Sequence, residues 1–344
     1  MRLLLFLTLM IFFNMNIQSQ QISSPDSKLI LSIKLSSENE LMYNLSRDGR
    51  IVMKDSKLGI DLLNQTSLLS GFKIDTVITS EFKEVWAPVL GEVDSILNHY
   101  NQMIVTLFQP IEKRKMVVTF RLFNDGLGFR YEFPVQDNLK YFTVIEENTQ
   151  FALTGDHKSF WIPGDYDSQE YTYTTSLLSE VHSGKGKSAD EISVKSNPGD
   201  NFVQTPLMMK TQDGLYINIH EAALLDYPVM YLEVDRNNFI LKSHLCPDAY
   251  NNKAYMQTPC KIPWRTIIVS DKAEDILSSK MILNLNEPTK FENVSWIKPK
   301  KYVGIWWGMH VGINSWNYSD INNVKLGKVD WNSLTPNGKH GATT

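Results

Sequence analysis

The chain has 344 residues, of which 42% are hydrophobic and 21% are charged, so it can bury a substantial core and is not of disordered composition. This length allows two or three ordinary domains, or one large all-β domain with an appendage. The formal net charge is −4, and acidic and basic residues are interspersed. Because no basic patch or stripe is present, we expect no nucleic-acid partner.

Residues 1–19 have the pattern of a secretory signal peptide. Arg2 supplies a positive charge, and residues 3–13 form an apolar run that is too short to span a bilayer. Polar residues follow immediately, and no cysteine near Ser19 offers a site for lipid attachment. We therefore expect cleavage near Ser19, a periplasmic location, and no membrane contact by the mature chain.

Residues 20–296 have the alternation and turn signals of antiparallel strands. Leu29, Leu31, Ile33 and Leu35 recur at every second position, which places them on one face of a strand. Asp-Gly pairs at 48–49 and 213–214, and Asn-Asp-Gly at 124–126, separate strand-like runs and are typical of tight hairpin turns. Further strands are predicted at residues 102–108, 229–234, 239–243, 264–269 and 280–285. The pattern predicts an all-β fold, a large antiparallel β-sandwich.

One helix is predicted in this region, over residues 271–279. The stretch DKAEDILSS lacks strand alternation, and its first residue, Asp271, is a plausible N-cap.

The segment FWIPGDYDSQEYTY, residues 160–173, contains the densest group of acidic and aromatic side chains. Asp165, Asp167 and Glu170 carry the oxygen ligands that calcium prefers, and the neighbouring aromatic rings suit the apolar faces of sugars. Their spacing lacks the full pattern of a calcium loop. A solvated turn packed by its own tyrosines is the simpler interpretation of these residues.

Two other sets of reactive side chains follow. His220, Glu221 and Asp226 could form an acid–base cluster, although such residues are more often hydrogen-bonded at the end of a strand. Cys246 and Cys260 could form one disulfide bond in an exported chain, and two reduced, half-buried thiols fit the sequence equally well.

The pattern changes at residues 297–344. Val303, Ile305 and the pair Trp306-Trp307 form an unbroken apolar run, which is typical of a strand buried on both faces of a parallel sheet. The tryptophans could line a sugar site or pack in a core. The residues after this run indicate a loop leading toward a helix.

Several of these stretches resemble one known family. RLFNDGLGFRYEFP, FWIPGDYDSQEY, GLYINIHEAALLDY and KYVGIWWGM are similar, in this order, to the N-terminal portion of glycoside hydrolase family 97. The resemblance implies that a sandwich at residues 20–296 packs on a catalytic (β/α)₈ barrel, and that residues 297–344 are the truncated start of this barrel. A whole barrel needs roughly 250 residues, so the chain would be part of a longer enzyme.

The resemblance also implies an activity and two site residues. Family members include calcium-dependent periplasmic α-glucosidases that act on malto-oligosaccharides, and α-galactosidases. Glu170 matches a sandwich glutamate that binds the active-site calcium, and Trp306 matches an aromatic residue of the substrate pocket. Gly308 stands where an acidic residue is expected. The catalytic acid and base would lie beyond Thr344, so we expect this chain alone to be inactive.

Two functions of other classes compete with the glycosidase. The chain could be a stand-alone carbohydrate-binding sandwich, or a structural sandwich such as an adhesin module. A stand-alone binding module should end near Trp296, whereas this chain runs on into the apolar strand of residues 301–307. An unpartnered apolar strand promotes aggregation, which favours a truncated longer protein over a binding module.

Overall fold

The computed structural model describes residues 19–188 and 195–301. The chain divides into two compact units between Pro288 and Thr289. In the second unit, residues 289–301 contain no helix or strand, and the rings of Phe291 and Trp296 pack edge to face at 6.2 Å. The predicted domain boundary at Trp296 stays a prediction, and the predicted strand at residues 301–307 lies almost wholly outside the described residues.

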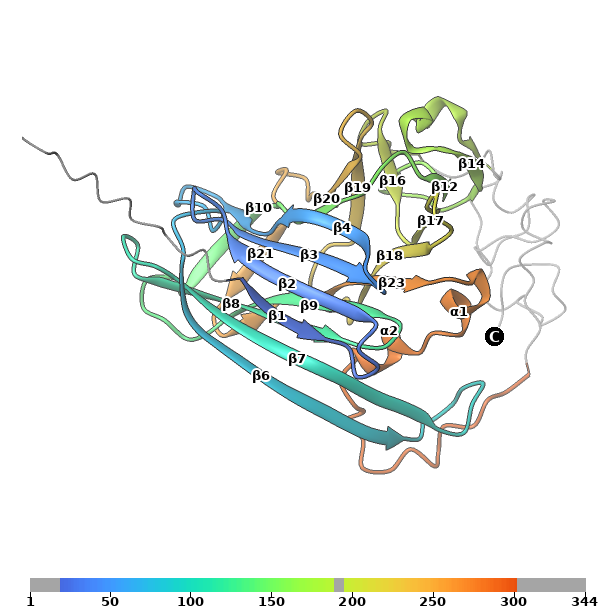
Figure 1. Ribbon diagram of the computed structural model, residues 1–344, viewed down its shortest axis with the longest axis horizontal. Coiled ribbons are helices and arrows are strands. Elements are labelled where there is room, and N and C mark those ends of the chain that lie inside the picture. Colours follow the sequence, from blue (N-terminus) through green and yellow to red (C-terminus); the bar gives the residue numbers. More distant parts are fainter. Residues whose placement is uncertain (1–18, 189–194, 302–344) are drawn as a thin grey trace, which may run out of the picture. The chain divides into compact units, whose positions relative to one another are not determined.

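One layer of the first unit is a ten-stranded antiparallel sheet (Figure 1). In spatial order its strands are β14 (Thr174–Leu177), β12 (Lys158–Trp161), β17 (Leu207–Lys210), β18 (Tyr216–Ala222), β23 (Trp264–Ser270), β9 (Gly126–Phe133), β8 (Arg114–Leu122), β7 (Ile96–Gln109) and β6 (Lys73–Trp86), and β22 (Cys260–Lys261) also pairs with β9. The predicted strands at 102–108 and 264–269 are confirmed as parts of β7 and β23.

The other layer consists of three smaller antiparallel sheets. The first contains β1 (Gln20–Ser23), β2 (Leu29–Leu35), β3 (Leu41–Arg47) and β4 (Arg50–Lys57). The second contains β21 (Ala254–Gln257), β10 (Tyr141–Glu147) and β5 (Ile60–Leu62). The third contains β11 (Gln150–Ala152), β20 (Ile240–Leu245), β19 (Met230–Asp235) and β16 (Phe202–Gln204).

The short elements between β12 and β16 complete the unit. They are the paired strands β13 (Tyr171–Thr172) and β15 (Lys187–Ser188), and the 3₁₀ turns η1 (Leu178–Glu180) and η2 (Ser183–Lys185).

Aromatic contacts join the two layers, and β9 lies at their centre. Phe129 of β9 packs on Tyr43 of β3 at 5.2 Å and on Phe151 of β11 at 6.2 Å, and Phe133 packs on Phe142 of β10 at 5.0 Å. Burial of each such ring stabilises the fold by about 1.5–3 kcal/mol. Each smaller sheet is therefore attached to the large one through β9. The predicted all-β sandwich is confirmed.

The predicted alternation and turns are also found. Leu29, Leu31 and Ile33 are wholly buried, and Leu35 packs partly buried against the same core. The hairpin between β3 and β4 turns at Asp48 and Gly49, both with positive φ, which glycine adopts without strain.

Two helices cover the outer face of the ten-stranded sheet, α1 (Ala273–Ser278) and α2 (Met281–Asn284). The prediction of a strand at residues 280–285 is wrong. Met281 and Leu285 are four residues apart and bury their side chains together in this cluster, which fits helical spacing. Asp271 is not the N-cap either, because its carboxylate pairs with Arg47 and Arg50. Within the described ranges, no helix is long and apolar enough to cross a membrane.

Candidate functional site

The acidic segment after β12 forms a loop built around one buried carboxylate. Trp161 ends the strand in the core, and Asp165 is only 1% exposed. Oδ1 of Asp165 accepts hydrogen bonds from the backbone N–H groups of Asp167, Ser168 and Ser196, at 2.9, 3.2 and 3.0 Å. These bonds close the turn and join it to the segment near Ser196.

The second oxygen of Asp165 binds a tyrosine. The hydroxyl of Tyr171 donates to Oδ2 at 2.5 Å, and the hydroxyl of Tyr231 donates to the backbone carbonyl of Asp165 at 2.8 Å. Burial acts to raise the pKa of Asp165, but the bonds from Tyr171 and the backbone hold it below its usual value. Burial and the same bond raise the pKa of Tyr171 to about 12. The pair is therefore a carboxylate with a neutral phenol.

A chain of polar side chains fixes the loop to the second layer. The hydroxyl of Tyr166 lies 2.6 Å from Nε2 of His244 on β20, and Nδ1 of His244 lies 3.1 Å from Glu146 on β10. The amide of Gln204 on β16 donates to the carbonyl of Ser168 at 2.8 Å. The loop is thus bound directly by β20 and β16, and Glu146 on β10 holds His244 in place.

Glu170 is the exposed end of this anchored loop. Its side chain is exposed, and its backbone N–H donates to the hydroxyl of Ser168 at 3.0 Å. Asp167 is also exposed, whereas the oxygens of Asp165 are already occupied by donors. The three acidic side chains therefore do not converge. In residues 19–188 and 195–301, no group of three or more His, Cys, Asp or Glu could hold a metal ion. Trp306 lies outside the described residues.

The acid–base cluster considered for His220, Glu221 and Asp226 does not form. His220 and Glu221 are neighbours on β18 and therefore occupy opposite faces of the sheet, and Asp226 lies in the exposed loop that follows. Burial lowers the pKa of His220, which favours the neutral imidazole. Glu221 points into the core between the layers and is hydrogen-bonded there. This agrees with the other interpretation, in which these residues are hydrogen-bonded at the end of a strand.

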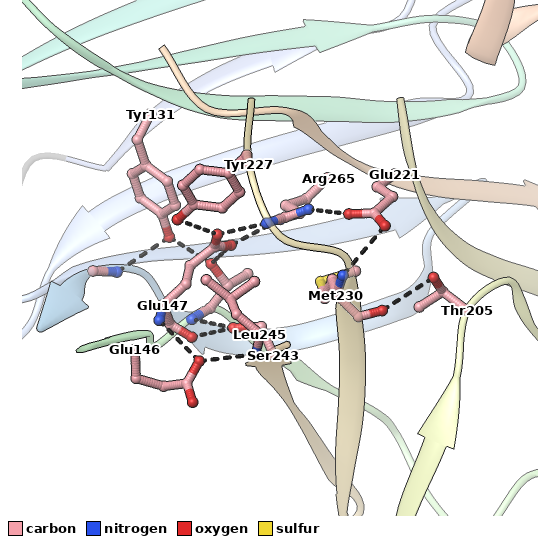
Figure 2. A network of polar contacts seen from close by, with 12 residues as sticks. Tyr131, Glu146, Glu147, Thr205, Glu221, Tyr227, Met230, Ser243, Leu245 and Arg265 are labelled. Carbon is pink, nitrogen blue, oxygen red and sulfur yellow. Dashed lines mark hydrogen bonds and ion pairs between the residues drawn. The ribbon is translucent and has the colours of Figure 1, made fainter. Parts of the chain in front are cut away.

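Glu221 belongs to a buried ionic network with Arg265 and Glu147 (Figure 2). Nε and Nη2 of Arg265 donate to the two oxygens of Glu147 at 2.8 and 2.7 Å, and Nη1 donates to Glu221. Glu147 also accepts from Thr149 at 2.8 Å and from Tyr227 at 3.4 Å. The network lies inside the sandwich with its charges paired, so it stabilises the fold and offers no catalytic group to solvent.

Sequence reasoning missed this network, although one signal for it exists. Arg265 interrupts the apolar run of β23, WRTIIVS, whose seven residues are all buried. A buried charge of this kind requires a partner, but the sequence does not say which of the many carboxylates it is. The cysteines are both free and half-buried. Burial raises the pKa of Cys246 and raises that of Cys260 to about 11, so both stay as thiols at neutral pH.

The sequence profile of the family described as Glycosyl-hydrolase 97 N-terminal matches residues 22–288. The chain belongs to glycoside hydrolase family 97. This family 97 sandwich is 25% identical to a retaining alpha-galactosidase of Bacteroides thetaiotaomicron, over 94% of this chain and 49% of the relative.

Solved structures of family 97 have the same fold. A family 97 enzyme of Pseudoalteromonas sp. strain K8 in complex with acarbose matches with a TM-score of 0.77 and 32% identity, over 94% of this chain and 44% of that one. The complex of a substituted variant of this enzyme with panose gives the same values. A beta-arabinopyranosidase with 19% identity and a TM-score of 0.62 shares the fold. This family 97 chain spans less than half the length of these relatives.

Proposed function

We propose that this family 97 sandwich is part of an α-glucosidase that hydrolyses α-linked oligosaccharides. The observation that carries the proposal is the likeness, at 32% identity, to an enzyme that is described in complex with acarbose and with panose. The catalytic acid and base belong to the barrel that the sandwich packs against. The sandwich contributes a rigid wall and one anchored loop ending at Glu170.

An α-galactosidase is the second candidate, and a specific observation favours it. The retaining alpha-galactosidase of Bacteroides thetaiotaomicron is 25% identical over nearly the whole chain. This identity is lower than the 32% shared with the enzyme in complex with acarbose, so we rank the α-galactosidase second. The glucoside and galactoside substrates differ only in the orientation of one sugar hydroxyl. In this proposal, residues of the barrel pocket recognise that hydroxyl.

Hydrolysis of two chromogenic substrates tests the proposal. The full-length enzyme should release p-nitrophenol from the α-glucoside faster than from the α-galactoside, and the reverse order would establish the second candidate. This chain alone should release none, because general acid–base catalysis contributes about 10²–10⁴-fold and both groups are supplied by the barrel. Turnover by the purified chain would refute the assignment of chemistry to the barrel.

Calcium is the cofactor in this proposal, with Glu170 as one ligand. The chemistry of the residue fits, because calcium prefers carboxylate oxygens and the Asp165 loop presents Glu170 at the surface. Calcium takes six to eight oxygen ligands, so the described part of the chain can supply only a share of them. The bound ion would stabilise negative charge at the site, and Trp306 would contact the sugar.

Export to the periplasm completes the proposal. Its support is the pattern of residues 1–19, which lie almost entirely outside the described residues. The intact mass of the protein recovered from cells should correspond to a chain that begins near Gln20. A mass that retains residues 1–18 would contradict export.

A further inference from the structure

The three-stranded sheet β21-β10-β5 has one buried and one exposed face. Phe142 and Val144 of β10 point into the core. Tyr141 of β10 lies directly opposite Gln257 of β21, and Thr143 lies opposite Tyr255. Because opposite residues of antiparallel strands share a face, these four side chains stand together on the outer side. Tyr141 and Tyr255 are 68% and 64% exposed.

This outer face contains a hollow of about 400 Å³, which is in the size range of small-ligand sites. Its lining consists of Leu63, Gln65, Tyr141, Thr143, Tyr255 and Gln257, together with Phe142 and Met256, whose side chains pack on the core. None of these side chains carries a charge. Two phenol rings, two amides and one hydroxyl therefore surround an electrically neutral surface.

The ring of Tyr255 is fixed although it is exposed. Its hydroxyl donates to Oδ2 of Asp248 at 2.7 Å and accepts from the amide of Asn252 at 2.9 Å. Oδ1 of Asp248 in turn accepts from the backbone N–H groups of Tyr250 and Asn252, at 2.8 and 2.9 Å. A ring that is already ordered loses little entropy when a ligand stacks on it.

We propose that this face, the tyrosine platform of Tyr141, Thr143, Tyr255 and Gln257, binds an α-linked neutral oligosaccharide outside the active site. Tyr141 and Tyr255 are diagonal neighbours across the strand pair, which separates them by about 7–8 Å and lets two rings contact successive sugars. Aromatic rings cover the apolar faces of sugars, and the amides and hydroxyl bind sugar hydroxyls. The choice of an α-linked ligand rests on the proposed function.

Calorimetric titration of this chain with maltoheptaose tests the platform. The parent should bind, and Tyr255→Ala should weaken binding about threefold to tenfold, the value of one aromatic contact. Tyr255→Phe keeps the ring but loses both hydroxyl bonds, so its affinity should fall between the two. Tyr250→Ala is the matched control, because Tyr250 is 84% exposed on the adjoining turn and does not line the hollow.

Thermal unfolding of each variant shows whether it is folded. If Tyr255→Ala does not fold, the affinity of Tyr255→Phe still tests the platform. No binding by the parent, or equal affinities of the parent and both Tyr255 variants, would overturn the platform. So would a full-length enzyme in which Tyr255→Ala loosens the attachment of the barrel and leaves sugar binding unchanged. Tyr255-dependent binding in an enzyme that hydrolyses no α-glycoside would keep the platform and refute the proposed function.

Discussion

Arg265 binds Glu147 through two parallel hydrogen bonds, and neither side chain is exposed to solvent. The two residues are 118 positions apart in the chain, on β23 of the ten-stranded sheet and β10 of the opposite layer. Burying two paired charges has a large desolvation cost. Removing one partner leaves the other charge unpaired in the core. The pair therefore makes the attachment of the two layers depend on both residues.

Arg265→Met should lower the free energy of unfolding by about 3–5 kcal/mol, because it leaves the carboxylates of Glu147 and Glu221 buried without a cation. Urea unfolding of the purified chain measures it. Arg50→Met is the matched control, since Arg50 pairs with Asp271 at the surface and such pairs are worth about 1 kcal/mol or less. Equal losses in the two variants would contradict the role of the buried pair.

Glu221→Gln should cost much less, about 1 kcal/mol, because the pair of Arg265 with Glu147 stays intact. Burial raises the pKa of Glu221 despite the neighbouring Arg265. The stability contribution of Glu221 is then complete below its ordinary pKa of 4.5 and is lost as pH rises through the higher folded value. The variant should therefore gain on the parent as pH rises from 4.5 toward neutrality. A gap that widens over this range, measured by urea unfolding at each pH, would refute the direction.

Asp165→Asn should destabilise the loop and the chain by about 1–3 kcal/mol, because an amide cannot accept all four hydrogen bonds of the carboxylate. The folded pKa of Asp165 is lowered, so this stability is present above its ordinary value of 3.8 and disappears as pH falls through the folded value. The difference from the parent should close in strong acid. Asp167→Asn, on the exposed side of the same loop, should change stability by about 0.5 kcal/mol or less.

In the calcium-dependent full-length enzyme that we propose, Glu170→Gln should raise the calcium concentration for half-maximal activity by about tenfold or more. The amide keeps the size of the side chain and loses the anionic oxygen that calcium prefers. Calcium titration of the rate measures it, and excess calcium should restore part of the activity. A Glu170→Gln curve that coincides with the parent curve, with Asp167→Asn displaced instead, would move the ligand to Asp167.

Local patterns determined much of the fold. The alternation of Leu29, Leu31 and Ile33 fixes which face of β2 is buried, because side chains alternate along any strand. The Asp48-Gly49 pair predicts its hairpin, since few residues adopt positive φ without strain. A short apolar run does not distinguish a strand from a buried helix. The sequence therefore predicts a strand at residues 280–285, where the structure has a helix.

Contacts between distant residues could not be predicted, because strand register and layer packing bring them together. The sequence of residues 160–173 contains three carboxylates and does not distinguish them. The fold buries Asp165 and exposes Glu170. Arg265 in an apolar run indicates a buried charge, but only the packing of the layer that contains β23 on the layer that contains β10 brings it to Glu147. Tyr141 and Tyr255 are ordinary strand residues in the sequence. They share one exposed face because two strands, far apart in the chain, pair in antiparallel register.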